Sequence, residues 1–203
     1  MAAVVATIPA GLTGLAFEHP LRVIFSKPLF ASAFLIVNGV ILLAGEAVRR
    51  RAEVRAIAAE RGTTHERTNF RRLDTLEFRE AFVIGLAQVL ALIAGISRSG
   101  ITMVAGLVRG LSHEEAARFS FLLATPIILA AGIYKLPDLF GPLGDGIRMQ
   151  VLVGSIVAGI AAYISVRFLM RYFTTKTLTP FGVFCVLEGL ACLIGFLATG
   201  QRL

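Results

Sequence analysis

Long apolar segments alternate with short polar turns along most of this 203-residue chain. They cover residues 2–17, 29–48, 80–94, 99–110, 117–136, 150–170 and 180–199. A helix needs roughly 20 residues to cross the hydrocarbon core of a bilayer, which is about 30 Å thick. Segments 29–48, 117–136, 150–170 and 180–199 have that length, and segment 2–17 falls slightly short of it. The pattern predicts an all-α fold, a polytopic membrane helical bundle that forms a single integral membrane domain over residues 1–203.

The composition of the chain supports the membrane class. Hydrophobic residues make up 56% of the chain and charged residues 16%, and the mean hydropathy is +0.79. A soluble domain of this size would have to bury several continuous apolar helices in one modest core, which the relation between surface and volume disfavours. The first segment has no basic region ahead of it and no site typical of signal-peptide cleavage, so we expect the chain to begin inside the membrane domain.

The positive charges are clustered, and their placement predicts the topology. The formal net charge is +7. Arginine and lysine collect in cytoplasmic loops, so residues 49–79 are predicted to be a cytoplasmic arginine-rich loop rather than a nucleic-acid-binding surface. Segments 80–94 and 99–110 would each extend only about 18–22 Å as helices, too short to cross alone. If the pair enters and leaves on one side, later cations also stay in the cytoplasm, namely Arg109, Arg118, Arg167, Arg171 and Lys176. We therefore predict a re-entrant helical hairpin over residues 80–110.

The turn of this hairpin, residues 97–102, which we call the tip, concentrates groups that bind oxyanions. An arginine at membrane depth costs on the order of several kcal/mol unless it is compensated, so Arg98 is by default a functional residue. Its planar guanidinium can bind two phosphate oxygens. Free amides at the start of the second half-helix add an anion nest, and glycine lets a ligand approach the chain closely. The glycines and hydroxyls are Gly95, Ser97, Ser99, Gly100 and Thr102. The pattern predicts a phosphate site that stabilises charge during phosphoryl transfer.

Two sequence blocks resemble the second signature region of undecaprenyl-diphosphatase, the bacterial membrane enzyme that recycles the cell-wall lipid carrier. The blocks are Gly-x-Ser-Arg-Ser-Gly-x-Thr at 95–102 and Phe-Ser-Phe-Leu-Leu at 119–123. Gln88, in the preceding half-helix, matches as well. The similarity extends from Ile8-Pro9 through Glu46 to Pro180-Phe181 and so covers nearly the whole chain.

The resemblance implies hydrolysis of undecaprenyl diphosphate to undecaprenyl phosphate and phosphate, which recycles the carrier for peptidoglycan synthesis and confers bacitracin resistance. It implies a multi-pass protein of the bacterial inner (plasma) membrane that contacts this lipid diphosphate and membrane lipid; a homodimer is left open. By the same resemblance, the catalytic residues are Arg98, Ser97, Ser99 and Thr102, and the substrate-binding residues are Gly95, Gly100 and Gln88. A divalent cation, Mg²⁺ or Ca²⁺, would offset charge between phosphate oxygens, with ligands mostly outside this chain and no metal ligand predicted within it.

Two signature runs of that family are missing from this sequence. Its members resemble an inverted repeat whose first re-entrant hairpin carries a Glu-Gly-x-x-Glu-Phe run and a Ser-Ser-x-Gly-His run. By this comparison the chain is expected to start about two membrane segments late, with half of the repeat partly missing, and its activity on its own is left open. Two smaller departures are Ala94, in place of the usual proline, and Cys185, where an arginine is common in the last helix.

Other functions share these features. Transporters also hold anionic substrates with half-helix ends near the membrane midplane, so a transporter or flippase for an anionic phospholipid is the main alternative. A phosphatase of the phosphatidic-acid type expects a histidine several residues after the arginine, and the next one here is His113, in a polar turn. A half-protein that assembles with another chain is a further alternative.

The remaining polar residues are predicted to be structural. Glu46 is expected to end an apolar helix and to pair with arginines at the membrane interface. His19, His65 and His113 have no ligand neighbour at metal spacing, so all of them are expected at the surface.

Overall fold

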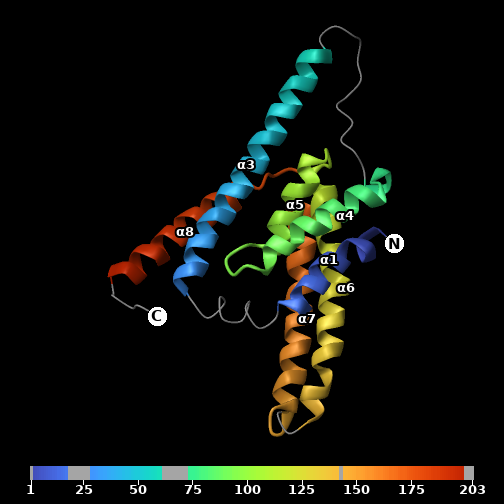
Figure 1. Ribbon diagram of the computed structural model, residues 1–203, viewed down its shortest axis with the longest axis vertical. Helices are drawn as coiled ribbons and strands as arrows, with labels where there is room; N and C mark the ends of the chain where they lie inside the picture. Colours follow the sequence, from blue (N-terminus) through green and yellow to red (C-terminus); the bar gives the residue numbers. More distant parts are fainter. Residues whose placement is uncertain (1, 18–27, 61–72, 142–143, 199–203) are drawn as a thin grey trace.

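The computed structural model describes residues 2–17, 28–60, 73–141 and 144–198, and its regular elements there are helices (Figure 1). The α-helices are α1 (Ala2–Ala16), α3 (Pro28–Glu60), α4 (Phe78–Ala87), α5 (Arg98–Val108), α6 (His113–Phe140), α7 (Arg148–Phe173) and α8 (Thr179–Ala198). Two 3-10 helices, η1 (Leu73–Thr75) and η2 (Gln88–Leu92), precede and follow α4. The predicted all-α class is confirmed.

The membrane-spanning lengths also agree with the hydrophobic pattern. Within the described ranges, four helices are long and apolar enough to cross a membrane, namely Pro28–Arg55 of α3 and the whole of α6, α7 and α8. They coincide with the four segments of sufficient predicted length. Helices α1 and α5 are apolar but shorter. The chain is therefore a multi-pass membrane protein.

Helix α3 differs from the prediction because it continues well past the apolar segment. Residues 49–79 were expected to form a loop, but α3 runs on to Glu60. The reason is local, because residues 49–60 consist mostly of alanine, arginine and glutamate, which are strong helix formers. Residues 61–72 of the predicted loop lie outside the described part of the chain, as do His19 and His65. The cytoplasmic location of the arginines stays a prediction.

Helices α3 and α8 pack antiparallel at very short range. A Cβ added at Gly39 would lie 2.7 Å from the carbonyl oxygen of Gly182, and one added at Gly189 would lie 3.0 Å from that of Ser32. Small residues that let two backbones approach closely are a typical means of helix association in membranes. This pair forms one arm of the molecule (Figure 1).

Helices α4 and α5, joined by η2 and a turn, form a hairpin close to the predicted residues 80–110. The N–H of Leu73, just before the hairpin, donates to Oε2 of Glu115, just after it, at 2.8 Å. The chain therefore enters and leaves the hairpin at the same place. Helix α5 runs alongside α3 in the same direction, with Gly100 against Leu42. This is the geometry that a re-entrant hairpin requires, and its depth in a bilayer stays a prediction.

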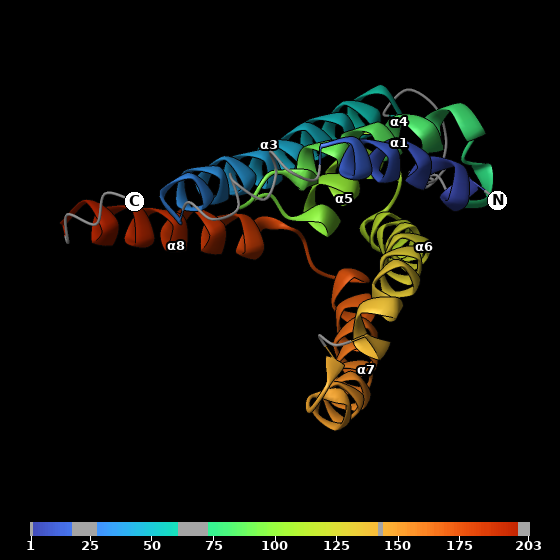
Figure 2. The ribbon, with the colours of Figure 1, turned by 60° about the horizontal axis from the view of Figure 1, so that its bottom comes forward.

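Helix α1 packs against α4, and the first part of α6 packs against α5. Helix α1 lies across α4, where Gly85 leaves no room for a Cβ against the backbone of Ala6. Helices α6 and α7 form a second hairpin that extends away from the others (Figure 2). Most apolar side chains of α7 are exposed. A helix that is apolar all round is typical of a membrane span, so lipid is its expected surrounding.

Candidate functional site

The tip begins where α5 begins. Ser97 is the N-cap of α5, with extended backbone, and its hydroxyl oxygen accepts a hydrogen bond from the N–H of Gly100 at 3.2 Å. Such a cap satisfies one of the amide groups that every helix leaves without an intrahelical partner at its start. The N–H groups of Arg98 and Ser99 have no acceptor among the residues that the structure describes. They remain as donors at the positive end of the helix dipole.

The side chains of the tip add further donors. The guanidinium of Arg98 is half-buried and makes no hydrogen bond or ion pair within the described ranges. Ser99 is exposed, and its hydroxyl lies 3.3 Å from that of Ser97. The tip therefore combines a partly desolvated positive charge, a hydroxyl and two backbone amides. This is a donor set that suits an oxyanion.

The tip lies beside the middle of the apolar part of α3. The N–H of Ser97 donates to Oδ1 of Asn38 at 2.9 Å. Asn38 is about ten residues from each end of the predicted apolar segment 29–48, or about 15 Å at the rise of an α-helix. If segment 29–48 crosses the bilayer as predicted, the tip would lie near the midplane, and this depth stays a prediction.

The two glycines of the motif have different roles in the backbone. Gly95 has a φ of +95°, a conformation that L side chains rarely adopt, and a Cβ there would clash with the carbonyl oxygen of Ala31 in α3. Gly95 therefore makes the turn and lets it approach α3 closely. Gly100 is helical, and its lack of a side chain makes room for Leu42. Their part in substrate binding stays a prediction.

Thr102 points away from the free donors of the tip. Its buried hydroxyl lies 2.7 Å from that of Ser120 in α6 and also donates to the carbonyl oxygens of Arg98 and Ser99. Ser120 makes a second contact, to the carbonyl oxygen of Ser99 at 3.3 Å. These bonds fasten the first turn of α5 to α6. The geometry gives Thr102 a structural contact, and its predicted catalytic role stays a prediction.

Gln88 makes no hydrogen bond to the tip. It lies at the start of η2 and is 2% exposed, and neither polar atom of its amide has a hydrogen-bond partner within the described part of the chain. A buried amide in this state costs free energy, which a ligand or water molecule would recover. Its predicted role in substrate binding stays a prediction.

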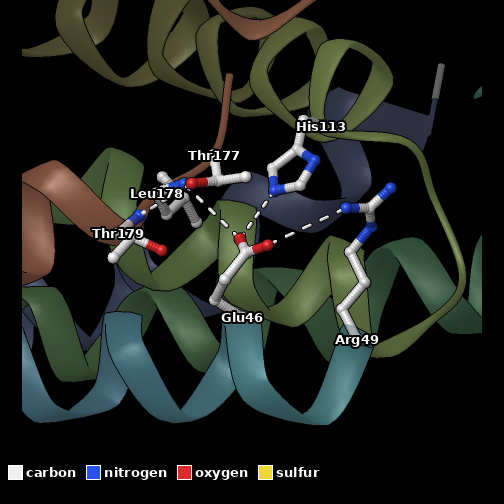
Figure 3. Close-up of polar contacts among 6 residues, drawn as sticks. All are labelled: Glu46, Arg49, His113, Thr177, Leu178 and Thr179. Carbon is white, nitrogen blue, oxygen red and sulfur yellow. Dashed lines mark hydrogen bonds and ion pairs between the residues drawn. The ribbon is translucent and has the colours of Figure 1, made fainter. Parts of the chain in front are cut away.

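A second polar cluster, which we call the polar joint, lies at the other end of α5 (Figure 3). It consists of Glu46 and Arg49 in α3, His113 at the start of α6, and the N–H of Leu178 before α8. Oε2 of Glu46 is hydrogen-bonded to Nε2 of His113 at 2.7 Å and accepts from the N–H of Leu178 at 3.4 Å. Nη1 of Arg49 lies 3.9 Å from Oε1 of Glu46. The carboxylate of Glu46 thus connects α3 with the start of α6 and with the segment before α8.

The polar joint corrects two predictions. His113 was expected at the surface, but it is only 6% exposed because Glu46, itself 3% exposed, lies opposite. Glu46 was expected to end its helix, whereas α3 continues past it. The expected pairing of Glu46 with an arginine is confirmed by Arg49. Sequence spacing carries no signal for a carboxylate and an imidazole that are 67 positions apart.

The described residues do not fit the divalent cation that the resemblance implies. Within the described ranges, no three His, Cys, Asp or Glu side chains are grouped as metal ligands. The tip offers hydrogen-bond donors and the positive charge of Arg98, whereas hard cations bind oxygen acceptors, chiefly carboxylates. Glu46 and His113 could supply two ligands, but the cation of Arg49 lies beside them. A Mg²⁺ or Ca²⁺ ion with ligands mostly outside this chain stays a prediction.

The comparison with known proteins adds to this geometry. A family model described as "Bacitracin resistance protein BacA" matches residues 1–191. The chain belongs to the BacA family. It is similar to "Undecaprenyl-diphosphatase 2" of Frankia alni, with 54% identity over 95% of this chain and 68% of the relative. It is also similar to "Undecaprenyl-diphosphatase" of Mycobacterium avium, with 56% identity over 94% and 64%, and to "Undecaprenyl-diphosphatase 1" of Burkholderia pseudomallei, with 45% identity over 98% and 66%.

The BacA-family match confirms the resemblance inferred from the tip and from residues 119–123. The chain spans about two thirds of the length of the curated BacA-family relatives that it matches. Sequence reasoning missed Asn38, which contacts the backbone of the tip, and Ser120, which contacts Thr102. A signal for Asn38 was present, because it is an amide in the middle of an apolar segment.

Proposed function

We propose that this BacA-family chain hydrolyses undecaprenyl diphosphate to undecaprenyl phosphate and phosphate in the bacterial inner membrane, and so recycles the lipid carrier for peptidoglycan synthesis. The observation that carries the proposal is the set of donors around Arg98 that have no acceptor within the described ranges and lie beside the middle of a helix long enough to span a membrane. The names of the relatives support this substrate. They give no support to a transporter or flippase.

In the proposed reaction, water attacks the terminal phosphorus and the bridging oxygen leaves with the lipid phosphate. Negative charge is spread over the phosphoryl oxygens in the transition state, so the protein contributes mainly positioning and electrostatic stabilisation. Arg98 binds two of these oxygens through its planar fork. The N–H groups of Arg98 and Ser99 and the hydroxyl of Ser99 donate to the remaining ones. Ser97 holds the first turn of α5 in place through its cap.

The proposal is tested by phosphate release from undecaprenyl diphosphate by the purified chain, with Arg98→Ala as the variant. Loss of a fixed donor to a developing oxyanion lowers kcat by about 10²- to 10³-fold, and Arg98 supplies more than one donor. We expect a loss of at least about 10³-fold. The matched control is Arg109→Ala, an exposed arginine at the other end of the same helix, which is expected to retain activity. An active Arg98→Ala variant, or a wild-type chain that releases no phosphate, would contradict the proposal.

A further inference from the structure

One polar side chain of α3 contacts the backbone of the tip. Oδ1 of Asn38 accepts the N–H of Ser97 at 2.9 Å. Asn38 is only 1% exposed, and its neighbours along α3 are apolar. Burying an amide costs free energy unless both its oxygen and its nitrogen find partners. A buried asparagine here therefore depends on the tip, and the tip depends on it.

The orientation of the Asn38 amide follows from its two contacts. Its Nδ2 donates to Sγ of Cys185 in α8 at 3.4 Å. Thiol sulfur is a weak acceptor, so the bond to Ser97 is the stronger of the two. The reversed amide would place Nδ2 against the N–H of Ser97, and two donors would then face each other. Only the observed orientation satisfies the backbone of the tip.

The contact lies next to the donors of the predicted site. Gly95 fixes one end of the turn by packing against α3, and the hydrogen bond from Ser97 fixes the other end. Arg98 follows Ser97 directly, so a shift of the Ser97 backbone moves the guanidinium and the free N–H groups with it. Donors stabilise a transition state most when they are held in place before the reaction. At 1% exposure Asn38 itself has no access to a substrate.

We propose that Asn38 is a positioning residue for the diphosphate site. Its side-chain oxygen holds the N–H of Ser97 and thereby fixes the turn that presents Arg98 to the substrate. This inference rests on the proposed function. It adds a residue of a crossing helix to a site whose other members all belong to the hairpin.

The test compares Asn38→Leu with the wild-type chain. Leucine branches at the same atom as asparagine, although it is larger, and it suits an apolar helix, but it offers no acceptor to Ser97. We expect kcat for phosphate release to fall about 10- to 100-fold, because small misplacements of catalytic groups cost rates of this size. KM is expected to change by less than about threefold, since the donors themselves remain. Hydrogen exchange of the Ser97 amide is expected to become faster.

Conservative variants separate positioning from general packing. Asn38→Asp keeps an oxygen that can accept from Ser97, and burial favours the neutral form of its carboxyl group, so it is expected to recover most of the lost kcat and to slow exchange of the Ser97 amide again. Cys185→Ala removes only the other contact of the same amide and is expected to leave kcat within about twofold of wild type. If Asn38→Leu does not fold, Asn38→Ala removes the acceptor without adding a large side chain and replaces it in the comparison.

Two results would overturn the inference. One is a kcat within about twofold of wild type in the acceptor-free variant, Asn38→Leu or Asn38→Ala. The other is an equal loss of kcat in Asn38→Asp and in that acceptor-free variant. Arg98→Ala, assayed in the same series, separates this inference from the proposed function. If Arg98→Ala is inactive and the Asn38 variants are fully active, only the role of Asn38 is contradicted. If Arg98→Ala is active, the proposed function itself is contradicted.

Discussion

The tip and the polar joint lie at opposite ends of α5. Both contact α3, but they do so in different ways. At the first turn of α5, the guanidinium of Arg98 has no partner within the described ranges and is half-buried. Just beyond the last turn, His113 is buried and bonded to Glu46 at 2.7 Å. The contacts on α3 are made by Asn38 and Glu46, which are about two turns apart and so lie on one face of that helix.

The difference separates groups that hold the fold from groups that are available to a ligand. A buried carboxylate is tolerated only when it is paired, and Glu46 is paired with its neighbours. Arg98 differs, because it is a partly desolvated cation without a partner within the described ranges. Its free energy falls when an anion binds, so it is available to a ligand. Changes in the polar joint should therefore affect stability, whereas changes in the donors of the tip should affect turnover.

The largest expected effect on stability comes from Glu46→Ala. Removing one member of a buried pair leaves the imidazole of His113 buried without its acceptor, and we expect the free energy of unfolding to fall by about 3 kcal/mol. Glu46→Gln should lower the free energy of unfolding by less, because its amide oxygen can still accept from the N–H of Leu178. The measurement is unfolding in detergent followed by circular dichroism. Glu53→Ala on the same helix is the control, and an equal loss in both alanine variants would contradict the role of the joint.

Arg98→Lys tests whether the tip needs a planar fork or only a positive charge. Lysine donates from a single point and cannot bind two phosphate oxygens in parallel. We expect phosphate release to fall about 30- to 100-fold, equivalent to about 2–3 kcal/mol in activation free energy. The free energy of unfolding should change by less than about 0.5 kcal/mol. Full activity with lysine would reduce the role of Arg98 to charge alone, and Arg109→Lys is the matched control.

Thr102→Val distinguishes the two roles that the sequence and the structure suggest for this residue. Valine keeps the shape but removes the hydroxyl that contacts Ser120. We expect the free energy of unfolding to fall by about 1–1.5 kcal/mol and phosphate release per folded molecule to fall less than about tenfold. A double-mutant cycle with Ser120→Ala should show coupling between the two hydroxyls. A rate loss as large as that of Arg98→Ala would instead support a catalytic Thr102.

The smallest expected effect belongs to Ser99→Ala. Its hydroxyl is exposed and has a 3.3 Å contact to that of Ser97. Because this hydroxyl is exposed, water can take over part of its role, so its loss should cost only about 0.5–1.5 kcal/mol and phosphate release should fall about three- to tenfold. The free energy of unfolding should be unchanged. Ser155→Ala, an exposed serine of α7, provides the comparison, and equal rates for both variants would exclude the Ser99 hydroxyl from the site.

The sequence predicted the helices better than their contacts. The four crossing helices, the hairpin near residues 80–110 and the special backbone of Gly95 followed from length, charge and glycine placement. The extension of α3 to Glu60 was missed, because arginine was interpreted by its charge and not by its helix propensity.

Contacts between distant segments were out of reach of the sequence. Asn38 with Ser97 and Glu46 with His113 join residues 59 and 67 positions apart. No periodicity encodes such pairs, because they depend on how α5 and the start of α6 lie on α3. For the same reason the sequence did not show that the hydroxyl of Thr102 turns away from the free donors of the tip.

The most direct test of the account is the affinity of the purified chain for undecaprenyl diphosphate, measured by titration calorimetry with and without Arg98. Undecaprenol, which has the same tail and no phosphate, reports the contribution of the tail alone. We predict that Arg98→Ala weakens binding of the diphosphate at least about tenfold, equivalent to about 1.4 kcal/mol, and leaves binding of undecaprenol unchanged. Equal affinity of the wild-type chain and Arg98→Ala for the diphosphate would contradict the assignment of the tip as its binding site.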